Sequence, residues 1–371
     1  MPKRRQKVKR YHRSFYSRGD KIKKAIGIVV LAVVVLGAAW LAAPYVLDWA
    51  THTWYTVVRD RDLSASSEAS SAASSEAASS SEAASSQAAS SEAASSRPEP
   101  VAGTVIREGS WSAVSLSALG DEASIRSTAQ SLAAQGVTYA VIPLKDTSGY
   151  VYYASAVPAA SGSVAATVVD PALIASIFKE EGLVPVAELA AFQDPVASYT
   201  VRSMAIQYSG DGSYLWLDAA NVAAGGKPWL NPYAASAVQF VGDLVEELYN
   251  AGFEQVCLSA VQFPHSTSSK QSFGETGGVS RDGQLTADIA AWDARFAGRV
   301  TLWYEYPLDS CTSVSPTLGA LPAQLGVKNL VISLPAGEAR DEAQLAQTTA
   351  QMKEMGAAHV VVRDSGSGSF C

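Results

Sequence analysis

Hydrophobic and polar positions divide the chain into four stretches. Residues 1–24 are polar and basic, residues 25–47 are apolar without one charge, residues 48–100 are mostly small and polar, and residues 101–371 alternate between apolar and mixed segments. At about 1.5 Å per residue, the apolar run crosses a hydrocarbon core of about 30 Å. A cleaved signal peptide is the alternative, but its apolar core is shorter, about 7–15 residues. We therefore predict one transmembrane helix over residues 25–47.

Charge on either side of this run predicts its orientation. Residues 1–24 contain 11 Lys or Arg and one acidic residue, so the positive-inside rule puts them in the cytoplasm, against anionic lipid. The rest of the chain has 17 basic and 34 acidic residues, a net charge of −17 that disfavours nucleic acid as a partner. We predict a single-pass protein of the cell membrane, with the lipid bilayer as a partner and an extracellular C-terminal domain.

A tract of imperfect SEAASS units fills residues 64–96. It has no aromatic or large aliphatic residue, so it cannot bury enough surface to offset the entropy lost on ordering. The sequence RPEP at 97–100 ends the tract, because proline stops a helix from continuing. Residues 48–100 are thus predicted to be a juxtamembrane segment and a solvated linker.

The domain at 101–371 has the length of a single α/β barrel. Strand-like apolar runs occur at 112–116, 138–144, 183–189, 214–217, 255–260, 299–304, 329–334 and 359–363. Helical patterns occur at 122–135, 171–181, 234–251, 285–296 and 341–355. This alternation predicts parallel strands with crossover helices, a (β/α)8 TIM-barrel-like fold. A doubly wound open sheet is the alternative, although no GxGxxG or GxxxxGK[ST] motif favours it.

Four segments of this domain follow one another in a distinctive order. They read VTYAVIPLKDTSGYVYYAS at 137–155, LVPVAELAAFQDP at 183–195, WLNPY at 229–233 and GFEQVCLSAVQFP at 252–264. Together they resemble a bacterial family of glycoside hydrolase-like surface proteins, which are barrels related to the alpha-amylase-type enzymes. The resemblance implies a barrel fold and an action on polysaccharide.

Several positions depart from that family's pattern. Its second-strand motif, Ile-Asp-Val-Lys-Asp, has an acid where Pro143 stands, and its third strand has an Arg where Glu188 stands. Its fifth-strand motif, Phe-Asp-Tyr-Val-Arg-Phe-Pro, has an acid at the position of Ser259 and an Arg at that of Gln262. The resemblance therefore implies the fold more strongly than the activity.

Two glutamates are the candidates for catalysis. Glycoside hydrolysis generally uses two carboxyl groups, and barrel enzymes place them at the carboxyl ends of strands. Glu188 ends the third predicted strand and Glu305 follows the sixth. Because side chains alternate between the faces of a strand, Glu188 shares a face with Val186, and Glu305 with Trp303. We predict this pair to be the acid and the nucleophile or base; solvated or ion-paired strand ends are the alternative.

Other polar and aromatic residues near strand ends are candidates for binding substrate. They are Lys145, Asp146, Asp194, Trp216 and Trp303. Each also has a structural explanation: Asp146 opens a turn-forming sequence, Asp194 precedes a proline and would cap a helix, and tryptophans pack in cores. The long loop at 263–283, rich in Ser and Gly, is a candidate for a lid over the barrel.

The sequence has few other groups that predict a chemical function. No HExxH motif or Cys/His ligand spacing predicts a metal, no motif predicts a cofactor, and no GxSxG predicts a nucleophile elbow. Cys257 lies in an apolar strand, whereas Cys311 and Cys371 follow the sixth and eighth predicted strands. Both of those loops lie on one face of a barrel, so we predict a Cys311–Cys371 disulfide outside the membrane.

The sequence leaves three functions open. The first is an extracytoplasmic glycoside hydrolase acting on envelope or environmental polysaccharide. The second is a catalytically degenerate barrel that binds glycan or a protein partner, favoured by the neutral Pro143 and Ser259. The third is an envelope scaffold.

Overall fold

A computed structural model describes residues 106, 109–265, 270–334, 341–364 and 369–370. The predicted membrane segment at 25–47 and the linker tract lie outside these residues, so both stay predictions. Among the described residues, none of the helices has the length and apolarity needed to cross a membrane.

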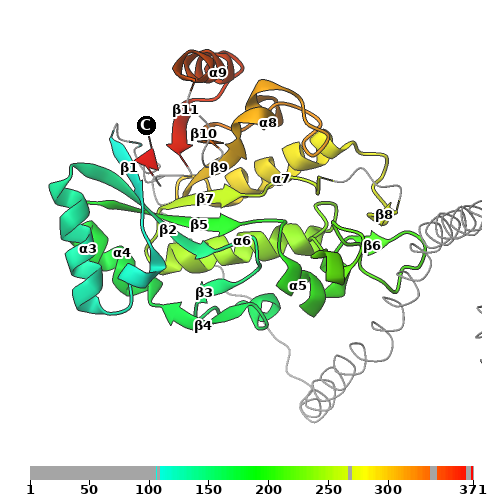
Figure 1. The fold of residues 1–371 in the computed structure, drawn as a ribbon, viewed down its shortest axis with the longest axis horizontal. Coiled ribbons are helices and arrows are strands. Elements are labelled where there is room, and N and C mark those ends of the chain that lie inside the picture. Colours follow the sequence, from blue (N-terminus) through cyan, green and yellow to red (C-terminus); the bar gives the residue numbers. More distant parts are fainter. Residues whose placement is uncertain (1–105, 107–108, 266–269, 335–340, 365–368, 371) are drawn as a thin grey trace, which may run out of the picture. The chain divides into compact units, whose positions relative to one another are not determined.

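The described chain alternates between strands and helices, in the order that the sequence predicted for most of its length (Figure 1). The strands are β1 (Ser110–Ala113), β2 (Val137–Lys145), β3 (Val151–Tyr153), β4 (Val164–Val169), β5 (Val184–Ala190), β6 (Gln207–Tyr208), β7 (Gln255–Ser259), β8 (Gln271–Ser272), β9 (Thr301–Pro307), β10 (Asn329–Leu334), β11 (His359–Asp364) and β12 (Ser369–Phe370). The α-helices are α3 (Glu122–Ala134), α4 (Pro171–Glu180), α5 (Pro195–Thr200), α6 (Ala235–Asn250), α7 (Arg281–Phe296), α8 (Leu308–Thr312) and α9 (Glu342–Glu354).

The main sheet closes on itself. Strands β1, β2, β5, β7, β9, β10 and β11 pair in parallel, each with the next. The short β12 then pairs antiparallel with both β11 and β1, which completes the ring. Strands β3 and β4 extend the sheet outward from β2. The fold is therefore α/β and barrel-like, as predicted, with a mostly parallel sheet.

One predicted barrel strand, 214–217, is wrong. Within this stretch Leu215 forms only an isolated bridge with Gln207, outside the barrel. Trp216 packs against Ile206 and Trp229 in a small separate cluster. The eighth place in the ring belongs instead to β12, so the barrel is not a regular run of eight β-then-α units.

The predicted helices are confirmed, and their ends follow the expected chemistry. Helix α4, for example, begins after Asp170, whose carboxylate accepts hydrogen bonds from the first backbone N–H groups. Helices α3 and α6 are followed by Gly136 and Gly252, which both have positive φ angles of 76° and 103°. Only glycine adopts this conformation readily, so these residues end the helices where the sequence predicted.

Two apolar cores lie on the two faces of the barrel strands. The larger core packs strand residues such as Ile142 and Leu258 against the surrounding helices. The smaller core fills the inside of the barrel and contains Trp111, Tyr139 and Trp303 among others. Alternate residues of each strand therefore belong to different cores, as the pleat of a strand requires. The candidate site lies directly against this inner core.

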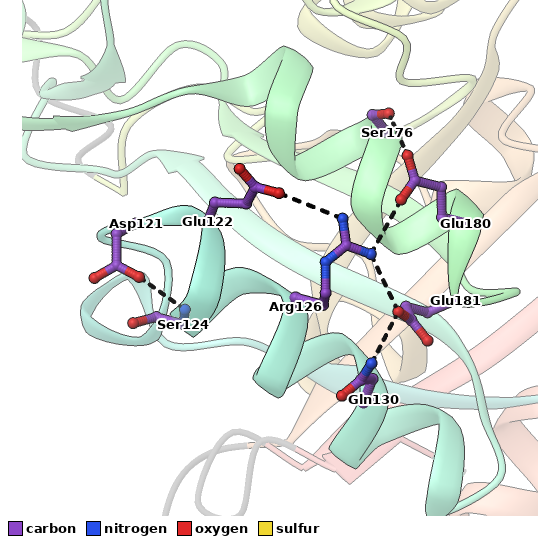
Figure 2. Close-up of polar contacts among 8 residues, drawn as sticks. All are labelled: Asp121, Glu122, Ser124, Arg126, Gln130, Ser176, Glu180 and Glu181. Atoms are coloured by element: carbon purple, nitrogen blue, oxygen red, sulfur yellow. Dashed lines mark hydrogen bonds and ion pairs between the residues drawn. The ribbon is translucent and has the colours of Figure 1, made fainter.

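Helices α3 and α4 pack side by side on the outside of the barrel (Figure 2). Arg126 lies between them and contacts Glu180 at 3.1 Å and Glu181 at 3.4 Å from α4 and its end, as well as Glu122 at 3.5 Å from its own helix. These side chains are largely open to water, where ion pairs contribute little stability. We regard this cluster as a structural feature of the helix pair.

Candidate active site

Glu188 and Glu305, the predicted catalytic pair, meet inside the barrel near the carboxyl ends of its strands. They come from β5 and β9, which are separated by β7, yet both side chains point inward. Arg363 of β11 joins them: its Nη1 lies 2.6 Å from Glu188 Oε1 and 2.7 Å from Glu305 Oε2. Because both oxygens contact one nitrogen, they lie no more than about 5.3 Å apart.

The three charged side chains are mostly buried but still reached by water, with 12–17% of each side chain exposed. Burial raises the pKa of Glu305, and the nearby charge of Glu188 adds to this, while Arg363 opposes it. Burial lowers the pKa of Arg363, but its contacts with the two carboxylates outweigh that effect and raise the pKa overall. The site thus has one permanent cation between two carboxyl groups.

The floor of the site is apolar and tightly packed. Cys257 of β7 pairs with Glu188 on one side and with Trp303 on the other. Burial raises the pKa of the Cys257 thiol, and the charges of Glu305 and Glu188 raise it further. Below it, Trp111 stacks on Tyr139 with ring centroids 4.5 Å apart and meets Trp303 edge-on at 4.8 Å. These buried rings make the side of the site beneath Cys257 apolar.

Trp303 and Trp216, both predicted to bind substrate, are 1% and 3% exposed. Trp303 belongs to the inner core, and its Nε1 donates a hydrogen bond to Gln255 Oε1 at 2.7 Å. Trp216 packs in the small cluster with Ile206 and Trp229. Neither ring has a face open to a ligand, so their burial corresponds to core packing, the alternative explanation from the sequence.

Lys145 and Asp194 are brought together, but away from the two glutamates. The pairing of β2 with β5 shifts register between Pro143 and Lys145, so that Lys145 lies opposite Leu189, a residue of the outer core. There its Nζ lies 3.0 Å from Asp194 Oδ2 and donates to the Ala190 carbonyl at 2.5 Å, with both charged side chains fully buried. This pair fastens the end of β2 to the start of α5.

Asp146 organises the turn between β2 and β3, as its structural explanation proposed. Its Oδ1 accepts hydrogen bonds from the backbone N–H of Ser148 at 2.9 Å and of Tyr150 at 3.3 Å. Its Oδ2 accepts from the Tyr152 hydroxyl at 2.7 Å. This contact is the main reason why the pKa of Tyr152 is raised to about 12. Both oxygens of Asp146 are therefore engaged within its own hairpin.

A separate pocket of about 400 Å³ lies between the β5–α6 and β7–α7 loops. Its lining includes Arg202, Gln207, Asn231 and Phe273, close to the small sheet of β6 and β8. In Figure 1 this small sheet lies beyond the arrowhead of β5. Asn231 is already engaged, because its Nδ2 donates to the Phe273 carbonyl and its Oδ1 accepts from the Tyr233 N–H. None of the glutamates of the candidate site lines this pocket.

The predicted Cys311–Cys371 bridge stays a prediction. Cys311 is buried in α8, and Cys371 lies outside the described residues. The predicted lid at 263–283 is likewise only partly described, and its described part contains β8 and the start of α7. In the part of the chain that the structure describes, no three His, Cys, Asp or Glu side chains gather to hold a metal ion.

Arg363 is the site residue that the sequence analysis missed. It is the last residue of the predicted strand 359–363, and it shares a face with Val361, which packs against the inner core. The alternation that placed Glu188 and Glu305 inside the barrel therefore places Arg363 there too. The signal in the sequence is therefore a basic residue at the end of a strand, on the face that points into the barrel.

Comparisons with known proteins extend these observations. No curated protein matches the chain. Among solved structures, a hypothetical protein from Ruminiclostridium thermocellum ATCC 27405 is 20% identical, with a TM-score of 0.45, over 52% of this chain and 95% of its own. The GH20 beta-N-acetylhexosaminidase from Streptomyces coelicolor A3(2) is 11% identical, with a TM-score of 0.40, over 66% of this chain and 45% of its own.

A cycloisomaltooligosaccharide glucanotransferase from Paenibacillus sp. is 10% identical, with a TM-score of 0.46, over 66% of this chain and 36% of its own. The chain therefore spans less than half of the length of either enzyme, and such weak likenesses carry no activity over to it. Residues 113–290, a little under half of the chain, match the model of a family described as "Putative glycosyl hydrolase domain". All four motifs of the sequence analysis lie in this range, and the chain therefore contains a glycosyl hydrolase-like domain.

Proposed function

We propose that this protein hydrolyses glycosidic bonds of a polysaccharide with Glu188 and Glu305 as its two catalytic carboxyl groups. The observation that carries the proposal is their separation: two inward-facing carboxylates lie within about 5.3 Å of each other, oxygen to oxygen. Enzymes that retain anomeric configuration hold their carboxyl groups about 5–5.5 Å apart, whereas inverting enzymes need about 6.5–9.5 Å to admit a water. The geometry therefore favours retention.

The reaction has two balanced steps. In the first, one carboxyl group gives its proton to the glycosidic oxygen as the C–O bond breaks, while the other carboxylate forms a bond to the anomeric carbon. In the second, the first group, now ionised, takes a proton from water as the water oxygen bonds to the anomeric carbon and releases the other carboxylate. The second step needs a water molecule, and the Glu188 and Glu305 side chains are 14% and 12% exposed.

A second candidate function is glycan binding without hydrolysis. It is favoured by Arg363, whose guanidinium stands between the two carboxylates and is held by both. It is also favoured by the neutral Pro143 and Ser259, where the family resemblance implies acids. A site of this kind would use its charged groups to hydrogen-bond sugar hydroxyls and would leave the glycosidic bond intact.

Hydrolysis and binding should be measured separately on the purified full chain. The substrates are a panel of nitrophenyl glycosides and envelope polysaccharides, with release of nitrophenol or of reducing ends as the readout for hydrolysis. Glu188→Gln and Glu305→Gln are each expected to lower kcat on polysaccharide by at least about 100-fold. Glu354→Gln, an exposed residue at the end of α9, is the matched control and should retain full activity. Hydrolysis that survives both site variants would refute the assignment.

The cellular setting is a further part of the proposal and rests on the sequence alone. We propose that residues 1–24 are cytoplasmic, that residues 25–47 anchor the chain in the cell membrane, and that the tract at 64–96 holds the domain outside the cell. In this position the domain has access to polysaccharide of the envelope or of the environment. Protease added to intact cells should remove the domain and leave an anchored fragment, whereas complete protection of the domain contradicts this orientation.

A further inference from the structure

The contacts of Arg363 with the two glutamates are unequal. Arg363 binds Glu188 through two nitrogens, with Nη1 at 2.6 Å from Oε1 and Nη2 at 3.2 Å from Oε2. It binds Glu305 through Nη1 alone, at 2.7 Å from Oε2. A two-point contact between a guanidinium and a carboxylate requires both carboxylate oxygens to be acceptors, so it stabilises the ionised form specifically. A one-point contact leaves the second oxygen of Glu305 available to carry a proton.

We infer that Arg363 is a positioning residue that holds Glu188 as the ionised nucleophile and leaves Glu305 as the proton donor. This assignment of roles rests on the proposed hydrolytic function. In a retaining reaction the two groups cannot share one protonation state, because one must attack as an anion while the other gives up a proton. Two carboxylates this close also disfavour simultaneous ionisation. The unequal contacts of Arg363 decide which of the two stays charged.

The surroundings of Glu305 agree with its role as the acid. Burial raises its pKa, the charge of Glu188 raises it further, and Arg363 and the Ser333 hydroxyl on β10 act in the opposite direction. On β7 the Cys257 thiol faces both carboxyl groups, and the same burial keeps it neutral. On β2 the residue level with Glu188 is Pro143, which has no charge. Arg363 is thus the single basic group described in contact with this pair.

Replacing Arg363 separates its positioning role from simple packing. In Arg363→Lys the ammonium keeps the charge but cannot form the fork-shaped two-point contact with Glu188. In Arg363→Met both charge and contacts are lost, so one proton should be shared between the two carboxyl groups. Arg299→Met is the matched control, because Arg299 makes the same two-point contact with Glu246, at 2.7 and 3.2 Å, on the surface between α6 and α7.

Protonation can be followed without any substrate. The full chain with ¹³C-labelled glutamate carboxyl groups is titrated by NMR, and the two signals are assigned with Glu188→Gln and Glu305→Gln. We expect Glu305 to titrate at higher pH than Glu188 in the wild-type chain, and the gap to shrink in Arg363→Lys and to collapse in Arg363→Met. Arg299→Met should keep the gap. The inference is overturned if Glu188 titrates at the higher pH, or if Arg363→Met leaves both titrations unchanged.

Kinetics with nitrophenyl glycosides provide the second readout. A good leaving group needs little protonation, so Glu305→Gln should retain more activity on 2,4-dinitrophenyl glycosides than on poorer leaving groups, whereas Glu188→Gln should be inactive on both. The reverse pattern would overturn the assignment of roles. An absence of hydrolysis by the wild-type chain on every substrate would refute the proposed function, while the order of titration would still test the role of Arg363.

Discussion

The buried carboxyl group of Asp288 gives the chain a stability that should depend on pH. Asp288 lies on α7, is 3% exposed, and accepts a hydrogen bond from Gln284 at Oδ1, while its Oδ2 has no hydrogen-bond partner among the described residues. Burial raises its pKa to about 7, which the bond from Gln284 only partly opposes. The folded chain therefore holds Asp288 protonated under conditions in which the unfolded chain has already ionised it.

The direction in which stability changes with pH follows from the linkage between proton binding and unfolding. Below pH 3.8, the ordinary value, both states are protonated and Asp288 costs nothing. Between pH 3.8 and about 7 the unfolded state releases the proton while the folded state keeps it, so stability falls by about 1.4 kcal/mol per pH unit. Above about pH 7 the loss is complete, at most about 4 kcal/mol.

Asp288→Asn removes this dependence. The Asn amide brings its own cost of about 1–3 kcal/mol, because an N–H group is left without a partner where Oδ2 now lies. That cost is the same at every pH, so the comparison between two pH values isolates ionisation. Urea unfolding of the full chain, followed by far-UV circular dichroism, should show Asp288→Asn gaining about 2–3 kcal/mol on the wild type between pH 5 and pH 8. Glu354→Gln controls for the loss of one charge. Parallel profiles for Asp288→Asn and wild type would refute the reasoning.

Three further changes test other parts of the structure. Lys145→Met leaves the buried Asp194 carboxylate without its cation and should destabilise the chain by about 3–5 kcal/mol in urea unfolding. Adding Asp194→Asn to this variant should recover part of the lost stability. No recovery would argue against the ion pair. Trp303→Phe removes the donor to Gln255 and should cost about 1–3 kcal/mol, with an unchanged midpoint contradicting the contact. Ala260→Gly relieves a φ of 53° just after β7 and should raise stability by about 0.5–1 kcal/mol, whereas a loss would show that the backbone is not strained there.

Much of the barrel was predictable from local pattern. The strand runs around Val141, Val186 and Val331 alternate between two buried faces, and the intervening helices carry capping residues at their starts and glycines after their ends. The segment at 214–217 misled the prediction because four apolar residues cannot show whether they join a barrel or a small cluster beside it. Strand β12 near the C-terminus was not predicted because its sequence lacks the apolar pattern that marks a strand. Its barrel pairing is made by the backbone, in a Ser- and Gly-rich stretch without an apolar pattern.

For the candidate site, the sequence by itself determined which side chains face the inside of the barrel. Strand alternation is a local property, so Glu188 and Glu305 could be placed on the inner face from their neighbours alone. Only the tertiary structure decided which inward groups meet. Arg363 is 175 residues from Glu188 and 58 from Glu305, and closure of the ring brings all three together. The same packing assigned Lys145, Asp194 and Trp303 to structural contacts, because burial and partner choice depend on strand register and on neighbours far away in the chain.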